Sequence, residues 1–358
     1  MDVENKKPEV LMVSTDMNGK GGVASVVSTY VNGGLLKNYN IKFLVTHIEG
    51  SNINKIFNFI CSLFTLSKFL ISRKCRIFHL HTASRSSFLR KSLISWLGIA
   101  FGKKIMLHLH GGEFMQFYND ECGSLMKWYI RSTLNAANQV VVLSSQWKRN
   151  IKSIADKANI TIIFNPVIVH NNRVDFTDKN ILLFLGKIGE GKGFWDILNA
   201  LSLIKETHRN FILKYAGDGE VEKAKLLIND LGLESYTEYI GWISGDKKQQ
   251  ILNQALIYLL PSYNEGLPMG ILEAMASKVS VITSPVGGIP DVIDSGVNGL
   301  LVKPGDINAL SQAIIKLLDS ESLRVSLTNN AYQGVKLKFS VDVVIPQIEA
   351  LYYKLGAR

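Results

Sequence analysis

The chain has 358 residues, of which 47% are hydrophobic and 20% are charged, so it is long enough for two ordinary domains and lacks the composition of a disordered protein. The N-terminus has no apolar segment typical of a signal peptide, and the most apolar stretch, residues 56–72, is interrupted by Asn58 and Lys68, which argues against a transmembrane helix. Three cysteines without a C-x-x-C spacing indicate neither a disulfide framework nor a zinc site, which fits a reducing cytoplasm.

The positive charge is confined to the first half of the chain. Residues 1–170 contain 21 Lys and Arg against 9 Asp and Glu, a net charge of +12, whereas residues 171–358 contain 19 against 21, a net charge of −2. This asymmetry predicts a basic surface in the first half that faces an anionic membrane, a phosphate-bearing lipid or a nucleic acid. A basic surface that faces only solvent is the alternative.

A strand is expected at residues 10–14, followed by a glycine-containing loop and a helix over residues 23–30. The backbone N–H groups of such a loop can bind a phosphate. Gly19, Gly21 and Ala24 also match the loose dinucleotide pattern G-x-G-x-x-A, with Glu49 as a possible ribose ligand after the next strand. A tight turn that binds nothing explains the same residues.

Residues 54–104 are rich in basic and aromatic side chains. Within them, residues 86–101 place apolar residues such as Phe88 and Trp96, and the basic Arg90 and Lys91, at the spacing of an amphipathic helix. Such a helix either lies in a membrane interface or packs on the core with its basic residues outward. No recognition helix or RNP-type strand accompanies the charge, so nucleic acid is not expected as a partner.

Two strand ends carry histidine pairs, His79 with His81 and His108 with His110. Strand alternation places both members of each pair on one face. No suitably spaced carboxylate apart from Glu113 accompanies them, so no metal site is expected. Arg85 and Arg90 could bind an acceptor phosphate or lie on a solvated face.

The domain boundary is expected near residue 170. A strand at residues 139–143 leads into a helix capped by serine, a further strand covers residues 161–164, and residues 170–179 are polar enough for a linker. The predicted domains are therefore residues 1–169 and residues 170–340. An amphipathic helix, about residues 341–358, is expected to close the chain.

The second half repeats the alternation of strands and helices. A strand at residues 181–185 runs into a glycine-rich turn that carries Lys187 and Lys192 before a helix that begins at Phe194. Two lysines on such a turn suit a pyrophosphate, because their charges stabilise a departing diphosphate. The order of residues is not that of a Walker A motif. Further strands are expected at residues 211–217 and 237–240, each followed by a glycine turn.

Glu265 and Glu273, separated by seven residues, flank a strand-to-helix turn that follows an apolar strand at residues 255–260. The helix is expected to begin near Met269, and its first N–H groups suit a phosphate or another anion. Each acid alone is explained equally well by helix capping. Glycines, prolines and an Asn-Gly turn continue the pattern through residue 305.

Residues 261–305, with the Glu, seven residues, Glu pattern, the Gly287-Gly288 turn and the Pro-Gly-Asp turn, resemble the retaining nucleotide-sugar glycosyltransferases of family 4, also called group 1. The resemblance implies two doubly wound, Rossmann-like α/β domains with parallel sheets that face across a cleft, the GT-B fold. It also implies that the closing helix, which contains Pro346, crosses back to the first domain.

The resemblance implies a role for each matching residue. His110, before a Gly-Gly pair, and Glu265 would contact the transferred sugar, and Glu273 the ribose. The diphosphate would lie against Lys187 and Lys192. The family usually has arginine at the position of Lys187, and lysine cannot make the bidentate contact that arginine makes. Turns would supply the other substrate contacts: Gly21, Gly22, Trp242, Ile243, Gly266, Leu267, Pro268, Met269 and Gly270.

The implied activity is transfer of a sugar, with retention, from a nucleotide-diphosphate donor to a lipid-linked or glycan acceptor in bacterial polysaccharide assembly. No cofactor is expected and, because no D-x-D motif is present, no metal. The basic first half suggests a cytoplasmic enzyme bound to the inner face of the plasma membrane. Three alternatives stay open: an epimerase of the same fold, a nicotinamide-dependent oxidoreductase, and a non-catalytic protein that binds membrane or nucleic acid.

Overall fold

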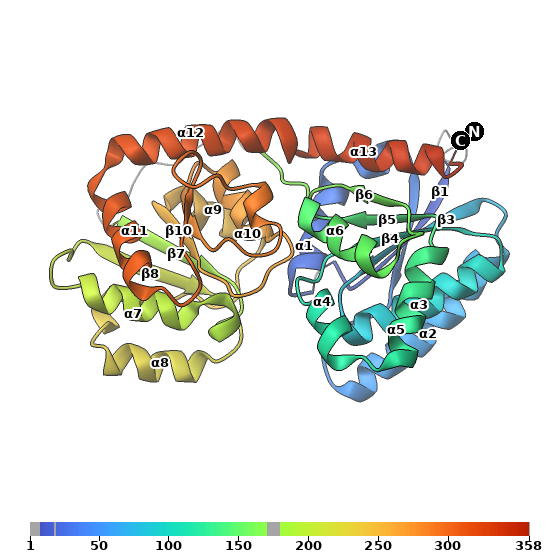
Figure 1. Ribbon diagram of the computed structural model, residues 1–358, viewed down its shortest axis with the longest axis horizontal. Helices are drawn as coiled ribbons and strands as arrows, with labels where there is room; N and C mark the ends of the chain where they lie inside the picture. The colour runs from blue at the N-terminus through green and yellow to red at the C-terminus, as the bar shows by residue number, and fades with distance from the viewer. Residues whose placement is uncertain (1–7, 18, 170–179, 358) are drawn as a thin grey trace. The chain divides into compact units, whose positions relative to one another are not determined.

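The computed structural model describes residues 8–17, 19–169 and 180–357. The chain divides into two compact units, a first unit of Met1–Pro166 with Val341–Arg358 and a second unit of Val167–Ser340. The expected boundary lay a few residues later, and the linker expected at residues 170–179 lies outside the described residues. Figure 1 labels most of the helices and many of the strands of both units.

The first unit is built on a six-stranded parallel sheet in the order β2-β1-β3-β4-β5-β6. The inner strands are short apolar runs that are buried on both faces, as in other parallel sheets that helices cover on both sides, whereas the edge strands β2 and β6 are partly exposed. Their bounds are β1 (Glu9–Ser14), β2 (Asn40–Val45), β3 (Cys75–Thr82), β4 (Lys104–Leu109), β5 (Gln139–Val142) and β6 (Ile160–Ile162).

Helices cover both faces of this sheet. The helical segments of the first unit are α1 (Gly22–Asn32), η2 (Leu35–Lys37), α2 (Asn52–Ile71), α3 (Arg85–Ala100), α4 (Phe114–Gln116), η3 (Phe117–Glu121), α5 (Ser124–Ala136), α6 (Ser145–Ile154) and α13 (Val341–Lys354). One face forms the main core, in which Leu107 of β4 packs with Phe88 of α3 and Ile130 of α5. Ser144 caps α6 by accepting a hydrogen bond from Trp147 N, as expected.

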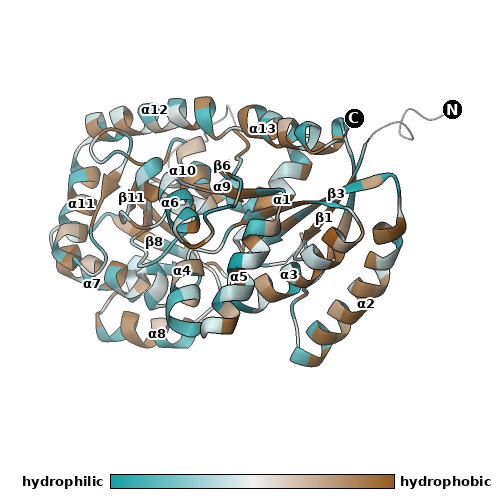
Figure 2. Ribbon diagram, turned by 45° about the vertical axis from the view of Figure 1, so that its right-hand side comes forward, coloured by the Kyte–Doolittle hydropathy of each residue, from teal (hydrophilic) through white to brown (hydrophobic). Residues whose placement is uncertain are grey.

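The helix expected at residues 86–101 forms as α3. Phe88 and Ile94 are buried in the core, as a core-facing helix requires, whereas Leu89 and Leu93 are exposed, so its interpretation as a membrane-interface helix stays a prediction. Lys91 is buried as well, with 2% of its surface exposed, so the basic residues do not all point outward. Figure 2 shows that α2, in contrast, carries hydrophobic residues along most of its length.

The second unit repeats the design with a six-stranded parallel sheet in the order β12-β11-β10-β7-β8-β9. Its strands are β7 (Asn180–Leu185), β8 (Phe211–Ala216), β9 (Thr237–Tyr239), β10 (Ile257–Leu260), β11 (Ser280–Thr283) and β12 (Leu300–Leu301). Its helical segments are η4 (Glu190–Lys192), α7 (Phe194–Ile204), α8 (Val221–Asp230), η5 (Glu234–Tyr236), α9 (Gly245–Gln254), α10 (Met269–Ala276), η6 (Ile289–Asp291), α11 (Ile307–Asp319) and α12 (Glu321–Lys338).

The direction of winding reverses once in each sheet. The chain runs from β7 to β8 and β9 on one side and then continues with β10 on the other side of β7. The same reversal occurs between β1 and β3 in the first unit. Ligands of open α/β sheets bind beyond the carboxyl ends of the strands at such reversal points.

The last helix, α13, belongs to the first unit, which confirms the expected return of the chain. Its side chains Val344, Ile348 and Tyr352 are buried there, and Pro346 lies near its N-terminal end. Among the described residues, no helix combines the length and the apolarity that a membrane span requires.

Candidate functional site

The loops that follow β7 and β10 meet at the carboxyl edge of the second sheet. Tyr263 N donates a hydrogen bond to Gly191 O at 3.1 Å. Gly193 adopts a φ of +67°, and a Cβ atom there would lie 2.2 Å from Pro261 O. Only glycine can come this close to Pro261 in this conformation. Gly193 therefore allows the loop after β7 to place Lys192 beside the loop after β10.

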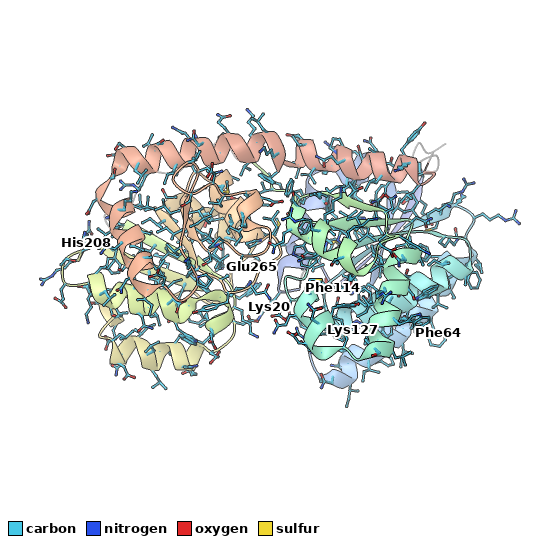
Figure 3. The ribbon with its side chains drawn as sticks, viewed as in Figure 1. Lys20, Phe64, Phe114, Lys127, His208 and Glu265 are labelled. Atoms are coloured by element: carbon cyan, nitrogen blue, oxygen red, sulfur yellow. The ribbon has the colours of Figure 1, made fainter. Side chains whose placement is uncertain are left out.

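Lys192 and Glu265 form an ion pair at this edge, with Nζ 2.5 Å from Oε1. The Glu265 side chain is nearly buried, with 7% of its surface exposed, whereas 32% of Lys192 is exposed. Ser262 Oγ donates a second hydrogen bond to the same carboxylate oxygen at 2.8 Å. A buried carboxylate requires such hydrogen-bond partners. The ammonium group of Lys192 remains partly exposed at the point where the strand order of the sheet reverses. Glu265 is labelled in Figure 3.

The loop after β11 supports the backbone of Glu265. Gly288 N donates to Gly266 O at 2.6 Å. Gly287 has a φ of +58°, and a Cβ atom there would lie 1.9 Å from Glu265 O. The Gly287-Gly288 turn therefore positions the loop between β10 and α10, which carries Glu265.

Helix α10 begins at Met269, as expected from the sequence, and ends at Ala276. Pro268 precedes it, and no side chain of the described residues caps its first turn, so the first N–H groups are available to an anion. Glu273 lies one turn further in and pairs with Lys248 of α9 at 2.5 Å. Burial, followed by the charges of Glu273 and Glu265, raises the pKa of Tyr258, so this tyrosine stays protonated beneath the site.

The remaining predicted residues of the second unit lie around this centre. Lys187 is exposed on the turn after β7. Trp242 and Ile243 follow β9, which β8 separates from β7, and 43% of Trp242 is exposed. No hydrogen bond among the described residues joins them to Lys192 or Glu265. Sequence reasoning missed Lys248, for which no local signal exists, and Ser262, whose position three residues before Glu265 could have suggested it.

In the first unit, Gly21 and Gly22 form the turn between β1 and α1. Gly21 has a φ of +115°, and a Cβ atom at either glycine would meet open space. The turn is therefore accessible to a ligand. Glu49, considered as a ribose ligand, instead accepts a hydrogen bond from Lys20 N at 2.6 Å.

The four histidines form one patch on the face of the sheet opposite the main core. His81 is paired in register with His108 on the neighbouring strand. His79 Nε2 lies 3.2 Å from His108 Nδ1, and His81 Nδ1 lies 2.8 Å from His110 Nε2. Tyr352 of α13 completes the row, with its hydroxyl oxygen 2.7 Å from His79 Nδ1.

This patch consists of neutral imidazoles. Burial lowers the pKa of His79, His81 and His108 far below the ordinary value, and it lowers that of His110 to about 3. Ligand atoms of His79, His81 and His108 lie within 4.8 Å of one another, so this group could hold a metal ion. Several of the nitrogens already face another imidazole or Tyr352, and the expected absence of a metal stays a prediction. The contact from His81 fixes the ring of His110 at the end of β4.

The two arginines considered for an acceptor phosphate are engaged differently. Arg85 pairs with Glu113 and Glu121. Arg90 is partly buried, which lowers its pKa. The guanidinium group of Arg85 is therefore engaged, whereas Arg90 Nε has no hydrogen-bond partner among the described residues.

Comparison with known proteins identifies the class to which this fold and site belong. The model of the family Glycosyltransferase Family 4 matches residues 26–170, and that of Glycosyl transferases group 1 matches residues 169–334. Together the two models cover most of the chain. The chain belongs to the group 1, family 4 glycosyltransferases, which confirms the resemblance seen in the sequence.

The relatives that match by sequence are distant. The chain is 24% identical to the capsular polysaccharide biosynthesis glycosyltransferase CapM of Staphylococcus aureus, over 60% of this chain and 61% of the relative. It is 28% identical to the amylovoran biosynthesis glycosyltransferase AmsK of Erwinia amylovora, over 62% and 58%. A glycosyltransferase of Methanocaldococcus jannaschii is 25% identical over 66% of this chain and 64% of its own length.

Solved structures show the fold. A sucrose-phosphate synthase of Thermosynechococcus elongatus matches with a TM-score of 0.81 at 19% identity, over 98% of this chain and all of that one. HepE of Anabaena, solved in complex with UDP, matches with a TM-score of 0.73 at 15% identity, over 97% of this chain and 100% of that one. The predicted α/β fold with two parallel-sheet domains of the GT-B type is confirmed.

Proposed function

We propose that the protein is a retaining glycosyltransferase that transfers a sugar from a nucleotide-diphosphate donor to a lipid-linked glycan acceptor at an anionic membrane surface. The observation that carries the proposal is the Lys192–Glu265 pair beside the uncapped start of α10, at the reversal point of the second sheet. The UDP complex of the similar HepE structure and the polysaccharide-related names of CapM and AmsK are consistent with it.

The donor diphosphate would lie against Lys192, Lys187 and the first N–H groups of α10. These groups stabilise the charge that grows on the leaving diphosphate. A diphosphate on Lys192 would compete for its ammonium group and leave the Glu265 carboxylate to accept hydrogen bonds from sugar hydroxyls. Glu273 would hold the ribose, and the turn at Trp242 and Ile243 would contact the base.

In the first unit, Gly21, Gly22 and His110 keep their proposed roles as substrate contacts, with His110 neutral throughout. The acceptor hydroxyl attacks the anomeric carbon from the face that the diphosphate leaves. The new C–O bond forms as the bond to phosphate breaks, and the acceptor proton passes to the leaving phosphate oxygen. No carboxylate nucleophile and no bridging metal is required by this scheme.

A binding panel tests the proposal. We expect one of UDP, GDP and ADP to raise the melting temperature by mass action, and Lys192→Ala to weaken that nucleotide by about tenfold or more, because a charge-assisted contact is lost. The matched control is Lys316→Ala, which removes an exposed lysine of α11. A wild-type protein that binds none of the three nucleotides contradicts the proposal.

The second arm follows nucleotide release from UDP-, GDP- and ADP-sugars. Glu265→Gln should keep nucleotide binding and lower sugar turnover by about a hundredfold, since the contacts proposed for its carboxylate are to the sugar. Isomerised donor sugar in the absence of an acceptor would instead indicate the epimerase.

A further inference from the structure

Helix α2 is apolar on two opposite sides. Ser51 caps its start by accepting a hydrogen bond from Asn54 N, and its inner side packs on the first unit through Leu66. Six further apolar side chains point to solvent and project within an arc of about 100° at 3.6 residues per turn. They are Ile53, Ile56, Phe57, Ile60, Phe64 and Ile71, each between 46% and 79% exposed.

This outer stripe needs an explanation because a helix on the surface of a water-soluble domain is normally apolar on one side only. The stripe runs along the length of the helix, which appears brown in Figure 2, and Phe64 is labelled in Figure 3. Contiguous exposed apolar surface of this kind marks an interaction site.

The charge around α2 indicates what that partner carries. From residue 50 to residue 112 the chain contains ten Lys and Arg and not one Asp or Glu. Lys91 is buried, Lys103 is bound to backbone carbonyls, and Arg85 is paired with acids beyond this stretch. Exposed and without a carboxylate partner among the described residues are Lys68, Arg73, Lys74, Arg76 and Lys104.

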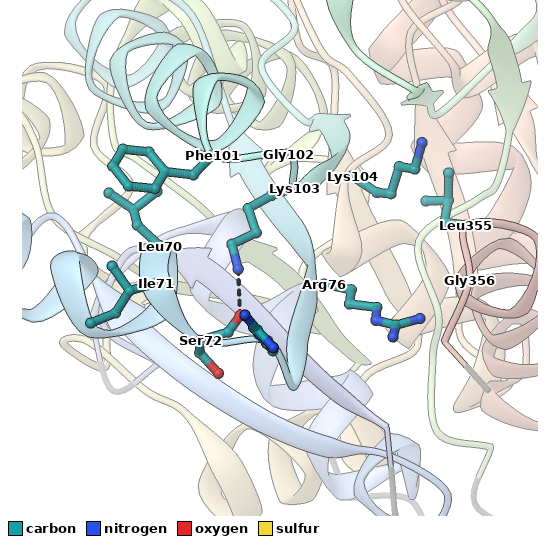
Figure 4. Close-up of a pocket in the computed structure, with 11 residues that line it drawn as sticks. Leu70, Ile71, Ser72, Arg76, Phe101, Gly102, Lys103, Lys104, Leu355 and Gly356 are labelled. Atoms are coloured by element: carbon teal, nitrogen blue, oxygen red, sulfur yellow. Dashed lines mark hydrogen bonds between the residues drawn. The ribbon is translucent and has the colours of Figure 1, made fainter.

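A pocket of about 510 Å³ joins the stripe to these charges at the C-terminal end of α2. Apolar Ile71 and Phe101 form one part of its lining, and Arg73, Arg76 and Lys104 another. Figure 4 shows Lys103 between Phe101 on one side and Arg76 and Lys104 on the other, with its ammonium group donating to Ser72 O. An anionic group in this pocket would have cations beside it and apolar surface next to it.

We propose that α2 lies in the interface of an anionic lipid bilayer, with its outer stripe among the acyl chains and with a lipid phosphate in the basic pocket. An anionic bilayer is the one partner that offers both apolar chains and negative charge along a surface as long as the helix. A second copy of the chain would bring two acid-free basic surfaces together, which costs energy. A nucleic acid would leave the stripe in water.

This inference deepens the proposed function, because a lipid-linked acceptor is reached from such a surface, but its test needs no sugar. The purified chain is sedimented with vesicles of phosphatidylcholine alone or with added phosphatidylglycerol. We expect binding to the anionic vesicles only, weakened by salt. The double variant Phe57→Ser with Phe64→Ser should bind at least about tenfold more weakly, and so should Arg73→Gln with Lys104→Gln.

Matched controls are available on α12 of the second unit. Leu337→Ser removes an equally exposed apolar side chain, and Lys336→Gln with Lys338→Gln removes two exposed charges. Both should bind vesicles as the wild type does. Failure of the wild type to bind anionic vesicles overturns the inference, as does an α2 variant that binds normally. A dimer in solution that Phe57→Ser with Phe64→Ser dissociates would assign the stripe to a second copy instead.

Cys61 of α2 allows a direct reading of depth. It is the exposed cysteine of the three, since Cys75 and Cys122 are buried. An environment-sensitive thiol dye on Cys61 should shift to shorter wavelength on anionic vesicles and be quenched by brominated acyl chains. An unchanged spectrum with bound vesicles would show that another surface docks. Nucleotide binding without vesicle binding would keep the proposed sugar transfer from a nucleotide donor and would remove this inference together with the membrane surface.

Discussion

Lys91 is a buried amine that the first unit accommodates at a cost. It lies on α3, and among the described residues no carboxylate pairs with it. Burial, and then the charge of Arg90, lowers the pKa of Lys91 from its ordinary 10.5 to about 7. The amine is therefore largely neutral in the folded chain at slightly alkaline pH, whereas it is protonated in the unfolded chain.

This difference predicts a pH dependence. Between about pH 7 and pH 10.5 the unfolded chain binds one more proton at Lys91 than the folded chain does. The free energy of unfolding should therefore rise by up to about 1.4 kcal/mol per pH unit across that window from this group. Lys91→Met should remove this slope and stabilise the first unit most at and below pH 7. Denaturant titrations of both proteins across the window test this, and equal slopes would contradict it.

At the residue scale, the sequence predicts part of the candidate site. The spacing of Glu265 and Glu273 and the glycines around Lys192 were visible in two separate strand-turn-helix patterns, because local chemistry sets where each helix starts. The partner of Glu273 was not visible, since Lys248 comes from another helix and is brought close only by packing. The roles of these residues toward a substrate stay predictions.

At the element scale, Gly270 shows how closely α10 packs on its strand. A Cβ atom there would lie 2.1 Å from the hydroxyl oxygen of Tyr258 on β10, and that hydroxyl donates to Leu185 O at 3.2 Å. Tyr258 is fully buried, so its side chain has no open space into which it could move away from such a Cβ atom. The start of α10 is thereby held at the edge of the sheet.

Gly270→Ala should destabilise the second unit by about 1–3 kcal/mol, the usual cost of overpacking. Adding Tyr258→Phe removes the clashing oxygen, so the double variant should lose less than the sum of the single variants. Gly334→Ala on α12 is the control, because a Cβ atom there meets no neighbour within 4 Å. It should stabilise the helix slightly. The free energy of unfolding of each variant is measured. If the losses of the two single variants simply add in the double variant, the packing explanation is contradicted.

Elements were predicted well where apolar runs are short and end at a glycine or a proline, as β7 does at Gly186 and β10 at Pro261. The two long helices of the first unit were not told apart in the same way. The sequences of α2 and α3 both contain apolar and basic residues. Periodicity alone does not indicate which apolar side of a helix is buried against another element. The structure buries Phe88 of α3 and leaves Phe57 and Phe64 of α2 exposed.

At the scale of the whole molecule, the chain leaves the first unit, builds the second and returns with α13. This return was predicted only from the resemblance to the family. The sequence of residues 341–358 contains no signal that indicates the unit on which the helix packs. The contacts that hold it span most of the chain. Tyr352 meets His79, and Asn38 donates to Glu349 Oε1 at 2.9 Å.

Removing residues 341–358 should therefore unfold the first unit and spare the second. Five apolar side chains of α13 are buried on the first unit, Val344, Ile345, Ile348, Leu351 and Tyr352. At about 1.5–3 kcal/mol each, their burial is comparable with the whole stability of an ordinary domain, about 5–15 kcal/mol. The truncation also leaves His79 without Tyr352, in a patch whose imidazoles are buried and neutral.

Hydrogen exchange followed by mass spectrometry measures both units in one sample. After truncation, amides of β3 and β4 should exchange as in an unfolded chain, while those of β7 and β10 stay protected and serve as the internal control. A milder variant, Tyr352→Phe, removes the contact with His79 and should cost about 1 kcal/mol in the first unit only. Loss of protection in both units on truncation would mean that the second unit does not stay folded alone. That result would contradict the prediction that the two units, each with its own core, fold independently.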